Sequence, residues 1–527
     1  MRTTPVIACG GLLAGALVAL SANAAQAATT TRYEAESSPA VCSGTIDSDH
    51  AGYSGGGFCN GANKAGAYAQ FTVNAPSAGT ATLHIRFANG TSAARPADVA
   101  VNGSAAPAVS FESTGSWDTW ATKTITVPVK SGANTVRFTP TGADGLANLD
   151  YVDVELGGDT PPPTGGDALY VAPGGSDGAA GTQSDPTTLA SAIGRVAPGG
   201  TIYMRGGTYR YSQTITIPEG EDGTSGARTR LSAYPGETPV LNFSAQSEDP
   251  ANRGLQVNGS YWQVSGLVVE HAGDNGIFVG GSNNVIERTV TRFNRDTGLQ
   301  ISRASSSTPR DQWPSGNLVV SAESHDNSDS DGEDADGFAA KLTVGTGNVF
   351  RYDVSHNNID DGWDLYTKTD TGAIGPVTIE DSLSYGNGTL TDGTQNGNGD
   401  RNGYKLGGDK IAVNHVVRRS IAYGNGHHGF TYNSNPGTMT ISDNASIDNA
   451  ERNFSFDTGT SVFRNNTSCR FAGGGSNDKV VGDADGSNQF WSGSNGSRCS
   501  SYTGALGWSF ASDGRLVVTF GGKVVTP

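Results

Sequence analysis

Five residues in the second half of the chain are of types that can do chemistry together, four carboxylates and one amine. They are Asp336, Asp360, Asp361, Asp364 and Lys405. Clustered carboxylates repel one another unless a cation lies among them, and oxygen ligands at variable spacing suit Ca²⁺ better than Zn²⁺. We therefore predict a calcium site. A merely acidic surface is the alternative, since the net charge of the chain is -17.

The segments around these residues align without gaps on a Gly that precedes a large apolar residue. They begin at Thr297, Asp336, Asp361, Asn402 and His428 and read TGLQIS, DGFAAK, DGWDLY, NGYKLG and HGFTYN. In a strand, the apolar residue would face the core and the next column would point outward. That outward column is Gln300, Ala339, Asp364, Lys405 and Thr431. Because hydrogen-bonded strands lie about 4.8 Å apart, the four aspartates and the lysine should converge on one external patch.

Lys405 is the candidate base of this patch. A uronic acid carries a carboxylate beside C5, so calcium bound to that carboxylate makes the C5 proton more acidic. A neutral amine can then remove the proton, and the C4 glycosidic oxygen leaves by β-elimination. Calcium would lower the pKa of Lys405 and Asp364 would raise it, so its charge state depends on the metal site. Lys341 is the alternative base, but we expect no carboxylate stacked on it.

The repeat that carries these segments predicts an all-β chain with a right-handed parallel β-helix. Gly is abundant at 75 residues and charged residues make up only 16%, which also favours a turn-rich β protein. From about residue 275 onward, short strands are followed by turns with an asparagine. Stacked asparagines can hydrogen-bond along the axis of such coils. The turn asparagines that we align are Asn294, Asn327, Asn358, Asn387, Asn425 and Asn449.

Composition divides the chain into four parts. Residues 1–27 are typical of a secretory signal, with Arg2, an apolar stretch and a small-x-small cleavage site ending at Ala27. Residues 28–157 alternate short strands and turns, as in a β-sandwich. Residues 158–167 are a Pro/Gly linker, and residues 168–527 contain the β-helix. No other stretch is long enough to span a bilayer, so we predict a secreted protein without a membrane partner.

Four cysteines remain outside the predicted signal, and they predict two disulfides. An even count in an exported chain favours the local pairs Cys42–Cys59 and Cys469–Cys499. A zinc site is the alternative, but no CxxC motif or pair of histidines accompanies them. After Gly459, the sequence is expected only to cap the coils and to supply the second pair.

The charge of the chain bears on its partners. A net charge of -17 and a pI near 4.8 argue against nucleic acid, since no basic stripe is present. An acidic protein that handles an acidic polymer would need local positive charge, such as a metal ion with a few Lys or Arg side chains. We expect a monomer.

Four segments of residues 30–157 resemble family 35 carbohydrate-binding modules. They are YEAE from Tyr33, GYSGGGF from Gly52, SWDTWATKTITVPV from Ser116 and ANLDYVDV from Ala147. The resemblance implies a structural calcium held by Glu34, Glu36 and Asp150, and a sugar site around Tyr53, Trp117 and Asn148. The residues alone leave alternatives open, a solvated strand face for the two glutamates and a core aromatic for Trp117.

Three segments of the larger domain resemble the active-site segments of family 9 polysaccharide lyases. They read HDNSDSDGEDADGFAAK, HNNIDDGWDLYTK and NGYKLGG, and the similarity runs from about Ala168 to Asp457. The resemblance implies four calcium ligands, Asp336, Asp360, Asp361 and Asp364, and Lys405 as the base. It therefore implies a calcium-dependent pectate lyase. The long Gly/Asn-rich loop at residues 388–401 is expected to shape the substrate groove.

Other functions remain open at this point. A lyase could act on another uronic polymer, such as rhamnogalacturonan. A β-helix glycoside hydrolase needs two carboxylates that flank the scissile bond, without obligatory calcium or lysine. A uronate epimerase would abstract the same proton without cleaving the chain. A non-catalytic adhesin is the remaining class, but it has no need of the patch around Lys405.

Overall fold

The computed structural model describes residues 30–64, 66–75, 79–130, 132–156, 168–511 and 513–526. The chain divides into two compact units, residues 1–158 and 159–527. The predicted signal at residues 1–27 and the predicted linker at residues 158–167 lie outside the described residues. Within the described part of the chain, no helix is long and apolar enough to cross a membrane.

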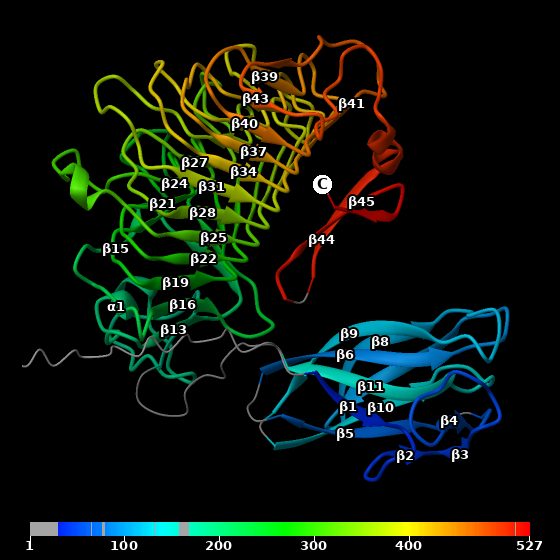
Figure 1. The fold of residues 1–527 in the computed structure, drawn as a ribbon. Coiled ribbons are helices and arrows are strands. Elements are labelled where there is room, and N and C mark those ends of the chain that lie inside the picture. Colours follow the sequence, from blue (N-terminus) through cyan, green and yellow to red (C-terminus); the bar gives the residue numbers. More distant parts are fainter. Residues whose placement is uncertain are drawn as a thin grey trace, which may run out of the picture. The chain divides into compact units, whose positions relative to one another are not determined.

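The first unit is a β-sandwich of two antiparallel sheets (Figure 1). In β5, apolar side chains such as Phe71 and Val73 are buried in the core between the sheets, whereas Gln70 and Thr72 are only half-buried. One sheet contains β3 (Gly44–Asp47), β4 (Phe58–Gly61), β11 (Asn148–Leu156), β6 (Gly79–Ala88) and β9 (Ala121–Val129), with β1 (Thr30–Glu34) paired to β11. The other contains β2 (Val41–Cys42), β5 (Ala69–Ala75), β10 (Gly132–Pro140), β7 (Arg95–Val101) and β8 (Ser104–Phe111).

The second unit is a parallel β-helix, in which successive coils add one strand to each of three sheets (Figure 1). The first sheet contains β12 (Ala168–Val171), β13 (Thr201–Met204), β16 (Thr229–Ala233), β19 (Trp262–Ser265), β22 (Val285–Glu287), β25 (Leu318–Val320), β28 (Asn348–Arg351), β31 (Val377–Glu380), β34 (Val416–Arg418), β37 (Thr440–Ser442), β40 (Val462–Arg464) and β43 (Asp483–Ala484). The second contains β14 (Gly207–Arg210), β17 (Pro239–Asn242), β20 (Val268–Glu270), β23 (Val290–Arg292), β26 (Glu323–His325), β29 (Val354–His356), β32 (Leu383–Tyr385), β35 (Ile421–Tyr423), β38 (Ala445–Ile447) and β41 (Thr467–Cys469). The third contains β15 (Ile215–Ile217), β18 (Leu255–Val257), β21 (Ile277–Val279), β24 (Leu299–Ile301), β27 (Phe338–Ala340), β30 (Trp363–Asp364), β33 (Tyr404–Lys405), β36 (Phe430–Thr431), β39 (Phe454–Phe456) and β42 (Lys479–Val480).

Short helices accompany the coils. The helix α1 (Leu189–Ile193) begins after Thr188, whose side chain accepts a hydrogen bond from the backbone of Ser191. It packs against β12, β13 and β15 and so covers the first coil. A single 3-10 turn, η1 (Arg310–Gln312), lies in the connection from β24 to β25.

The column that follows Gly in the third sheet faces the core, as predicted. Leu299, Phe338, Trp363, Tyr404 and Phe430 are fully buried. The four aromatic rings stack along the axis, with centroid separations of 4.9 Å for Phe338 and Trp363 and 4.6 Å for Tyr404 and Phe430. Burial of each such side chain contributes about 1.5–3 kcal/mol. This stack sets the register that brings the outward residues of neighbouring coils together.

The predicted asparagine ladder is confirmed. Each side-chain amide except that of Asn449, the last member, donates to the side-chain oxygen of the asparagine in the next coil, at 2.8 or 2.9 Å. The members are Asn294, Asn327, Asn358, Asn387, Asn425 and Asn449. A second ladder, which the sequence alignment missed, precedes the first sheet at Asn284, Asn317 and Asn348. Both ladders satisfy buried polar groups along the axis.

Both predicted disulfides are present. Cys42 and Cys59 join β2 to β4 in the sandwich. Cys469 and Cys499 join β41 to the 3-10 helix η2 (Ser497–Tyr502).

The end of the chain does more than cap the coils, which corrects the expectation for residues after Gly459. It forms a three-stranded antiparallel sheet, drawn in red in Figure 1. Phe520 of this sheet joins Ile421 of the second β-helix sheet in one buried cluster, and Trp508 Nε1 donates to the Tyr385 hydroxyl at 3.0 Å. The sheet therefore covers the outer side of the second β-helix sheet. Its strands are β44 (Leu506–Phe510), β45 (Leu516–Phe520) and β46 (Lys523–Val525).

Acid should destabilise the β-helix through His415, whose ring lies just before β34 of the first sheet. His415 is fully buried, and its Nδ1 accepts a hydrogen bond from the backbone of Val377 at 3.1 Å. Burial lowers the pKa of His415 to about 3. As the pH falls below about 6.5, His415 takes up a proton in the unfolded chain but stays neutral in the native state. The free energy of unfolding therefore falls by about 1.4 kcal/mol per pH unit towards pH 3.

His415→Asn keeps an acceptor for Val377 but does not titrate. We therefore expect the variant to lose less of its thermal stability between pH 6.5 and pH 4 than the wild type, measured by circular dichroism. His271→Asn, at an exposed position of the same unit, is the control. Parallel pH profiles for the wild type and His415→Asn would contradict this account.

Candidate active site

The third sheet and the turns that enter it carry the candidate active site. In three successive coils, these turns connect β26 to β27, β29 to β30, and β32 to β33. The first turn contains Asp336, and the second contains Asp360 and Asp361. Asp364 in β30 and Lys405 in β33 are direct neighbours in the strand register. The coil repeat thus brings together residues that are far apart in the sequence.

Three of the predicted calcium ligands form a buried group. Asp336, Asp360 and Asp361 offer carboxylate oxygens that lie within 4.8 Å of one another, and all three are buried. The backbone amide of Asp361 donates to Asp336 Oδ1 at 3.3 Å. The amides of Arg401 and Asn402 donate to Asp360 Oδ1 at 2.9 Å and to Asp361 Oδ1 at 2.5 Å. Backbone groups from the neighbouring coil therefore hold these carboxylates in place.

Lys405 lies beside this group, as its place in the outward column predicts. Its Nζ is 3.2 Å from Asp361 Oδ2, 3.8 Å from Asp364 Oδ2 and 2.8 Å from Asp400 Oδ2. The Lys405 side chain is only 9% exposed, so the predicted external patch is largely covered. The loops that flank the third sheet account for this burial.

Lys341 corrects one expectation from the sequence. It was expected to have no carboxylate stacked on it, but its Nζ is 2.8 Å from Asp336 Oδ2 and 3.5 Å from Asp364 Oδ2. Lys341 lies just after β27, and its long side chain reaches back to the turn that carries Asp336. Asp364 Oδ2 consequently lies between two ammonium groups, those of Lys341 and Lys405.

Burial raises the pKa values of the aspartates of the site, whereas for Lys405 burial and the neighbouring carboxylates act in opposite directions. Burial raises the pKa of Asp361 to about 6 and raises the pKa values of Asp336 and Asp360 well above the usual range of aspartate. Burial lowers the pKa of Lys405, but the carboxylates of Asp364 and Asp361 outweigh it and the net pKa is raised. Without a metal ion, Lys405 is therefore an ammonium group.

The donor set fits a calcium ion. Five carboxylates, those of Asp336, Asp360, Asp361, Asp364 and Asp400, lie around two lysines, so negative charge is in excess. Within the described part of the chain, the buried Asp364 Oδ1 has no hydrogen-bond partner. Ca²⁺ is coordinated by oxygen ligands alone, and a carboxylate oxygen without a hydrogen-bond partner is free to be one of them. Which of the aspartates would bind the ion stays a prediction.

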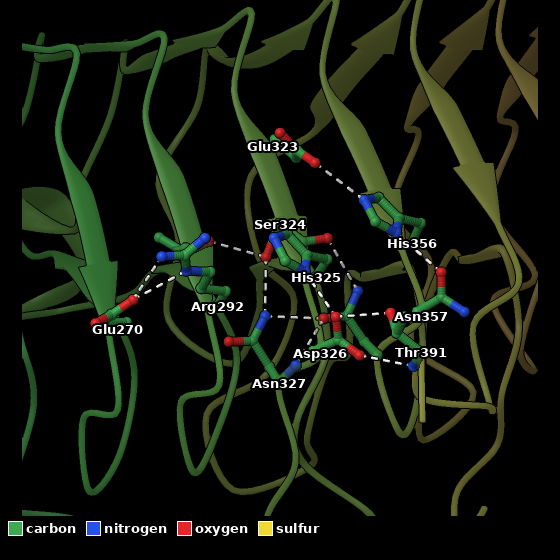
Figure 2. A network of polar contacts seen from close by, with 12 residues as sticks. Glu270, Arg292, Glu323, Ser324, His325, Asp326, Asn327, His356, Asn357 and Thr391 are labelled. Atoms are coloured by element: carbon green, nitrogen blue, oxygen red, sulfur yellow. Dashed lines mark hydrogen bonds and ion pairs between the residues drawn. The ribbon is translucent and has the colours of Figure 1, made fainter. Parts of the chain in front are cut away.

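The long turn from β32 to β33 is tied to the second sheet (Figure 2). Asp326 Oδ1 accepts from the Thr391 backbone amide at 2.7 Å, and Oδ2 accepts from the Thr391 hydroxyl at 2.8 Å. His325 Nδ1 is 2.7 Å from Asp326 Oδ2. Further along, the Asn396 side chain donates to the Asp331 carbonyl at 2.8 Å. These contacts hold a loop whose far end lies in the candidate active site.

Two residues of the site, Asp400 and Asn402, were not predicted from the sequence. Lys341 was considered as a base, but its contacts with carboxylates were not predicted. Asp400 lies at the end of the long loop, where the sequence offers no register that could place it. Asn402 does occupy the column of Asp336 and Asp361, and its side-chain amide donates to Asp361 Oδ1 at 3.0 Å. The column alignment was the signal that could have identified it.

The predicted calcium ligands of the sandwich converge on one loop. Glu34 Oε1 accepts from the Ser54 hydroxyl at 2.6 Å, Asp150 accepts from the Ser54 amide at 3.0 Å, and Glu36 Oε1 accepts from the Gly56 amide at 2.7 Å. Strand β1 ends at Glu34, so Glu36 lies beyond the strand and the two glutamates do not share one strand face. Glu34 Oε2 and Glu36 Oε2 are buried without a hydrogen-bond partner among the described residues. These orphaned oxygens fit a cation, and the ligand roles stay a prediction.

The predicted sugar-site residues of the sandwich are only partly brought together. Trp117 is half-buried and stacks on His50 with ring centroids 6.2 Å apart. The rings of Tyr53 and His50 both contact the ring of Phe58, with centroid separations of 5.7 and 5.9 Å. Asn148 is buried at the start of β11. Trp117 and Tyr53 thus flank one aromatic group, and the role of all three residues in sugar binding stays a prediction.

Two regions of the chain match known families. Residues 169–467 match the family described as Pel9A-like, right-handed beta helix region. Residues 34–155 match the carbohydrate-binding module of family 6. The first unit is therefore a carbohydrate-binding module, and its finer assignment to family 35 stays a prediction.

Curated relatives and a solved structure agree with this match. Pectate lyase L of Paenibacillus polymyxa (strain SC2) is 57% identical over 325 residues, which cover 61% of this chain and 72% of that protein. Pectate lyase L of Thermoclostridium stercorarium is 43% identical over 324 residues, which cover 61% of this chain but only 26% of that protein. The crystal structure of pectate lyase Pel9A is 32% identical, with a TM-score of 0.56, and the match covers 66% of this chain and 86% of that chain.

Proposed function

The chain belongs to the Pel9A-like right-handed β-helix family, and from this premise we propose that it is a secreted, calcium-dependent pectate lyase. The chain is an enzyme of the polysaccharide lyase class, and pectate is the substrate in the names of its curated relatives. The observation that carries the proposal is the position of Lys405 Nζ, 3.2 Å from Asp361 and 3.8 Å from Asp364. β-Elimination from a uronate requires a base for the C5 proton, and the clustered carboxylates could hold the cation that would let this amine act as one.

Asp336, Asp360, Asp361 and Asp364 are proposed to hold calcium. A bound calcium ion would offset the carboxylate charge that keeps Lys405 protonated, and would bind the substrate carboxylate and so make the C5 proton more acidic.

Lys405 is proposed to act as the base in its neutral form. Its amine takes the proton from C5, the electron pair of that C–H bond forms a double bond between C5 and C4, and the bond from C4 to the glycosidic oxygen breaks. The released sugar oxygen then takes a proton from solvent. Asp361 and Asp364 orient the amine by charge, as ion-pair partners at 3.2 and 3.8 Å. Burial of Lys405 limits competing proton exchange with bulk water.

The first unit is proposed to bring the enzyme to its polymer. It is a carbohydrate-binding module, and we propose that Glu34, Glu36 and Asp150 hold a structural calcium in it. Trp117, with Tyr53 nearby, is the proposed sugar-contacting surface, because a half-buried aromatic ring can stack on a sugar face. We further propose that residues 1–27 direct export and that the enzyme works as a monomer.

Polygalacturonate incubated with the enzyme and calcium should gain the ultraviolet absorbance of an unsaturated uronate, because β-elimination leaves a double bond conjugated to the carboxylate. The rate of absorbance change on polygalacturonate, compared with rhamnogalacturonan, checks both the reaction and the substrate. Reducing ends that appear without this absorbance would identify a hydrolase instead. A faster rate on rhamnogalacturonan would reassign the substrate.

A further inference from the structure

A cavity of about 490 Å³ lies beside Lys405, and the proposed mechanism does not use it. Residues of three successive coils line it, among them Tyr366, Asp400 and Lys410. Asp400 also contacts Lys405 Nζ at 2.8 Å, and the Tyr366 ring centroid lies 5.5 Å from that nitrogen. The cavity is therefore next to the proposed base, since two of its lining residues contact Lys405.

The Tyr366 ring is held as a fixed wall of this cavity. Its hydroxyl donates to Asp409 Oδ1 at 2.8 Å, and Asp409 Oδ2 accepts from the amide and the hydroxyl of Thr369 at 2.7 and 2.9 Å. A Cβ atom at Gly408 would lie 2.3 Å from the ring carbons of Tyr366, so only glycine allows this close contact. The ring orientation is thus fixed by neighbours on both sides.

The rim that contains Asp409 has an unusual backbone. Asp409 and Lys410 have φ values of 48° and 58°, and Asn433 and Ser434, one coil further, have values of 41° and 63°. Among the described residues, these are the only two pairs of consecutive non-glycine residues in the left-handed region. The Lys410 amide donates to the Ser434 hydroxyl at 3.2 Å and links the two pairs. Such strain is typical of functional sites, where the surrounding structure maintains it.

Lys410 supplies the positive charge of this rim. Its side chain is exposed, and within the described part of the chain it forms no ion pair with a carboxylate. Asp409, its neighbour, is already satisfied by Tyr366 and Thr369. The lining of the cavity therefore includes an aromatic ring and an ammonium group that has no ion-pair partner among the described residues. This pairing suits a sugar that has both an apolar C–H face and a carboxylate.

We propose that this cavity binds the uronate unit adjacent to the one that loses its C5 proton. Tyr366 is the platform for the sugar ring, and Lys410 pairs with the carboxylate of that unit. Both are binding residues that determine specificity for a charged polymer. The proposal rests on the proposed lyase function, since it places a second uronate relative to Lys405.

Lys410→Met and Tyr366→Ala test the proposal, with Lys523→Met as the control for an exposed lysine elsewhere. We expect KM for polygalacturonate to rise about tenfold in each test variant, with kcat changed less than about threefold, and no change for the control. Lys410→Arg should restore most of the lost affinity. Unchanged KM in both test variants, or a fall in kcat alone, would overturn the proposal. Melting curves identify a variant that has failed to fold.

A direct binding measurement separates this inference from the proposed function. Trigalacturonate is titrated calorimetrically into Lys405→Ala, which cannot turn it over, with and without the added Lys410→Met substitution. A roughly tenfold weaker affinity in the double variant supports the cavity, and equal affinities overturn it. If wild-type enzyme produces no unsaturated product from any uronic polymer, the lyase function itself fails instead.

Discussion

Lys405→Ala is expected to lose nearly all lyase turnover, with kcat falling by about 10²–10⁴-fold. Lys405 supplies the amine that removes the C5 proton, and its Nζ lies within 4 Å of three carboxylate groups that orient it. An alanine side chain at position 405 has no group that could accept the proton. The ultraviolet absorbance of unsaturated product, followed at saturating polygalacturonate and calcium, measures the loss.

The same variant should keep its fold and its calcium affinity. Removing an ammonium group from beside Asp361 and Asp364 removes a competing cation, so calcium should bind at least as tightly, as calorimetry can test. Lys523→Ala serves as the control for loss of an exposed lysine. Near-normal turnover by Lys405→Ala would exclude it as the base, and a selective loss in Lys341→Ala would then point to Lys341.

Removal of calcium should also abolish turnover, and added calcium should restore it. The excess of buried carboxylate charge around Lys405 keeps this lysine protonated unless a divalent cation lies there, and a protonated amine cannot act as a base. The measurement is the initial rate after dialysis against chelator, followed by titration with calcium. We expect the rate to fall at least about 100-fold and to return with calcium.

Asp361→Asn is the matched substitution for this prediction. It keeps the size of the side chain and an acceptor for the Asn402 amide but removes one charge. Its rate should therefore need more calcium to reach its maximum, by about tenfold or more, and calorimetry should show the same weakening. Full activity in excess chelator would contradict the role of the metal.

Much of the fold could be predicted from the sequence, because its signals are local and periodic. The alternation after each Gly places Phe338, Trp363 and Tyr404 inside and Asp364 and Lys405 outside, and the strand register agrees. The turn asparagines were also identified, because a side-chain amide can both donate to and accept from its neighbour in a stack and so leaves no buried amide unpaired. Within the sheets, the residues that neighbour one another on successive coils follow directly from the repeat.

Contacts made by loops and long side chains could not be predicted in the same way. Lys341 reaches Asp336 because its flexible side chain bends back across its own turn, and no column alignment contains that path. The loop that ends at Asp400 meets Lys405 because Asp326 holds Thr391 at its other end. The repeat does not set the course of such insertions.

The sequence by itself determined which residues stack on neighbouring coils, since strand alternation and the coil repeat leave one register that buries the apolar column. It therefore determined that Asp364 and Lys405 are neighbours and that carboxylates of adjacent coils approach them. Only the tertiary structure decided the burial of this group, its second lysine and the additional carboxylate of Asp400. The physical reason is that burial and charge balance depend on how the loops fold over the third sheet, and that packing is not periodic.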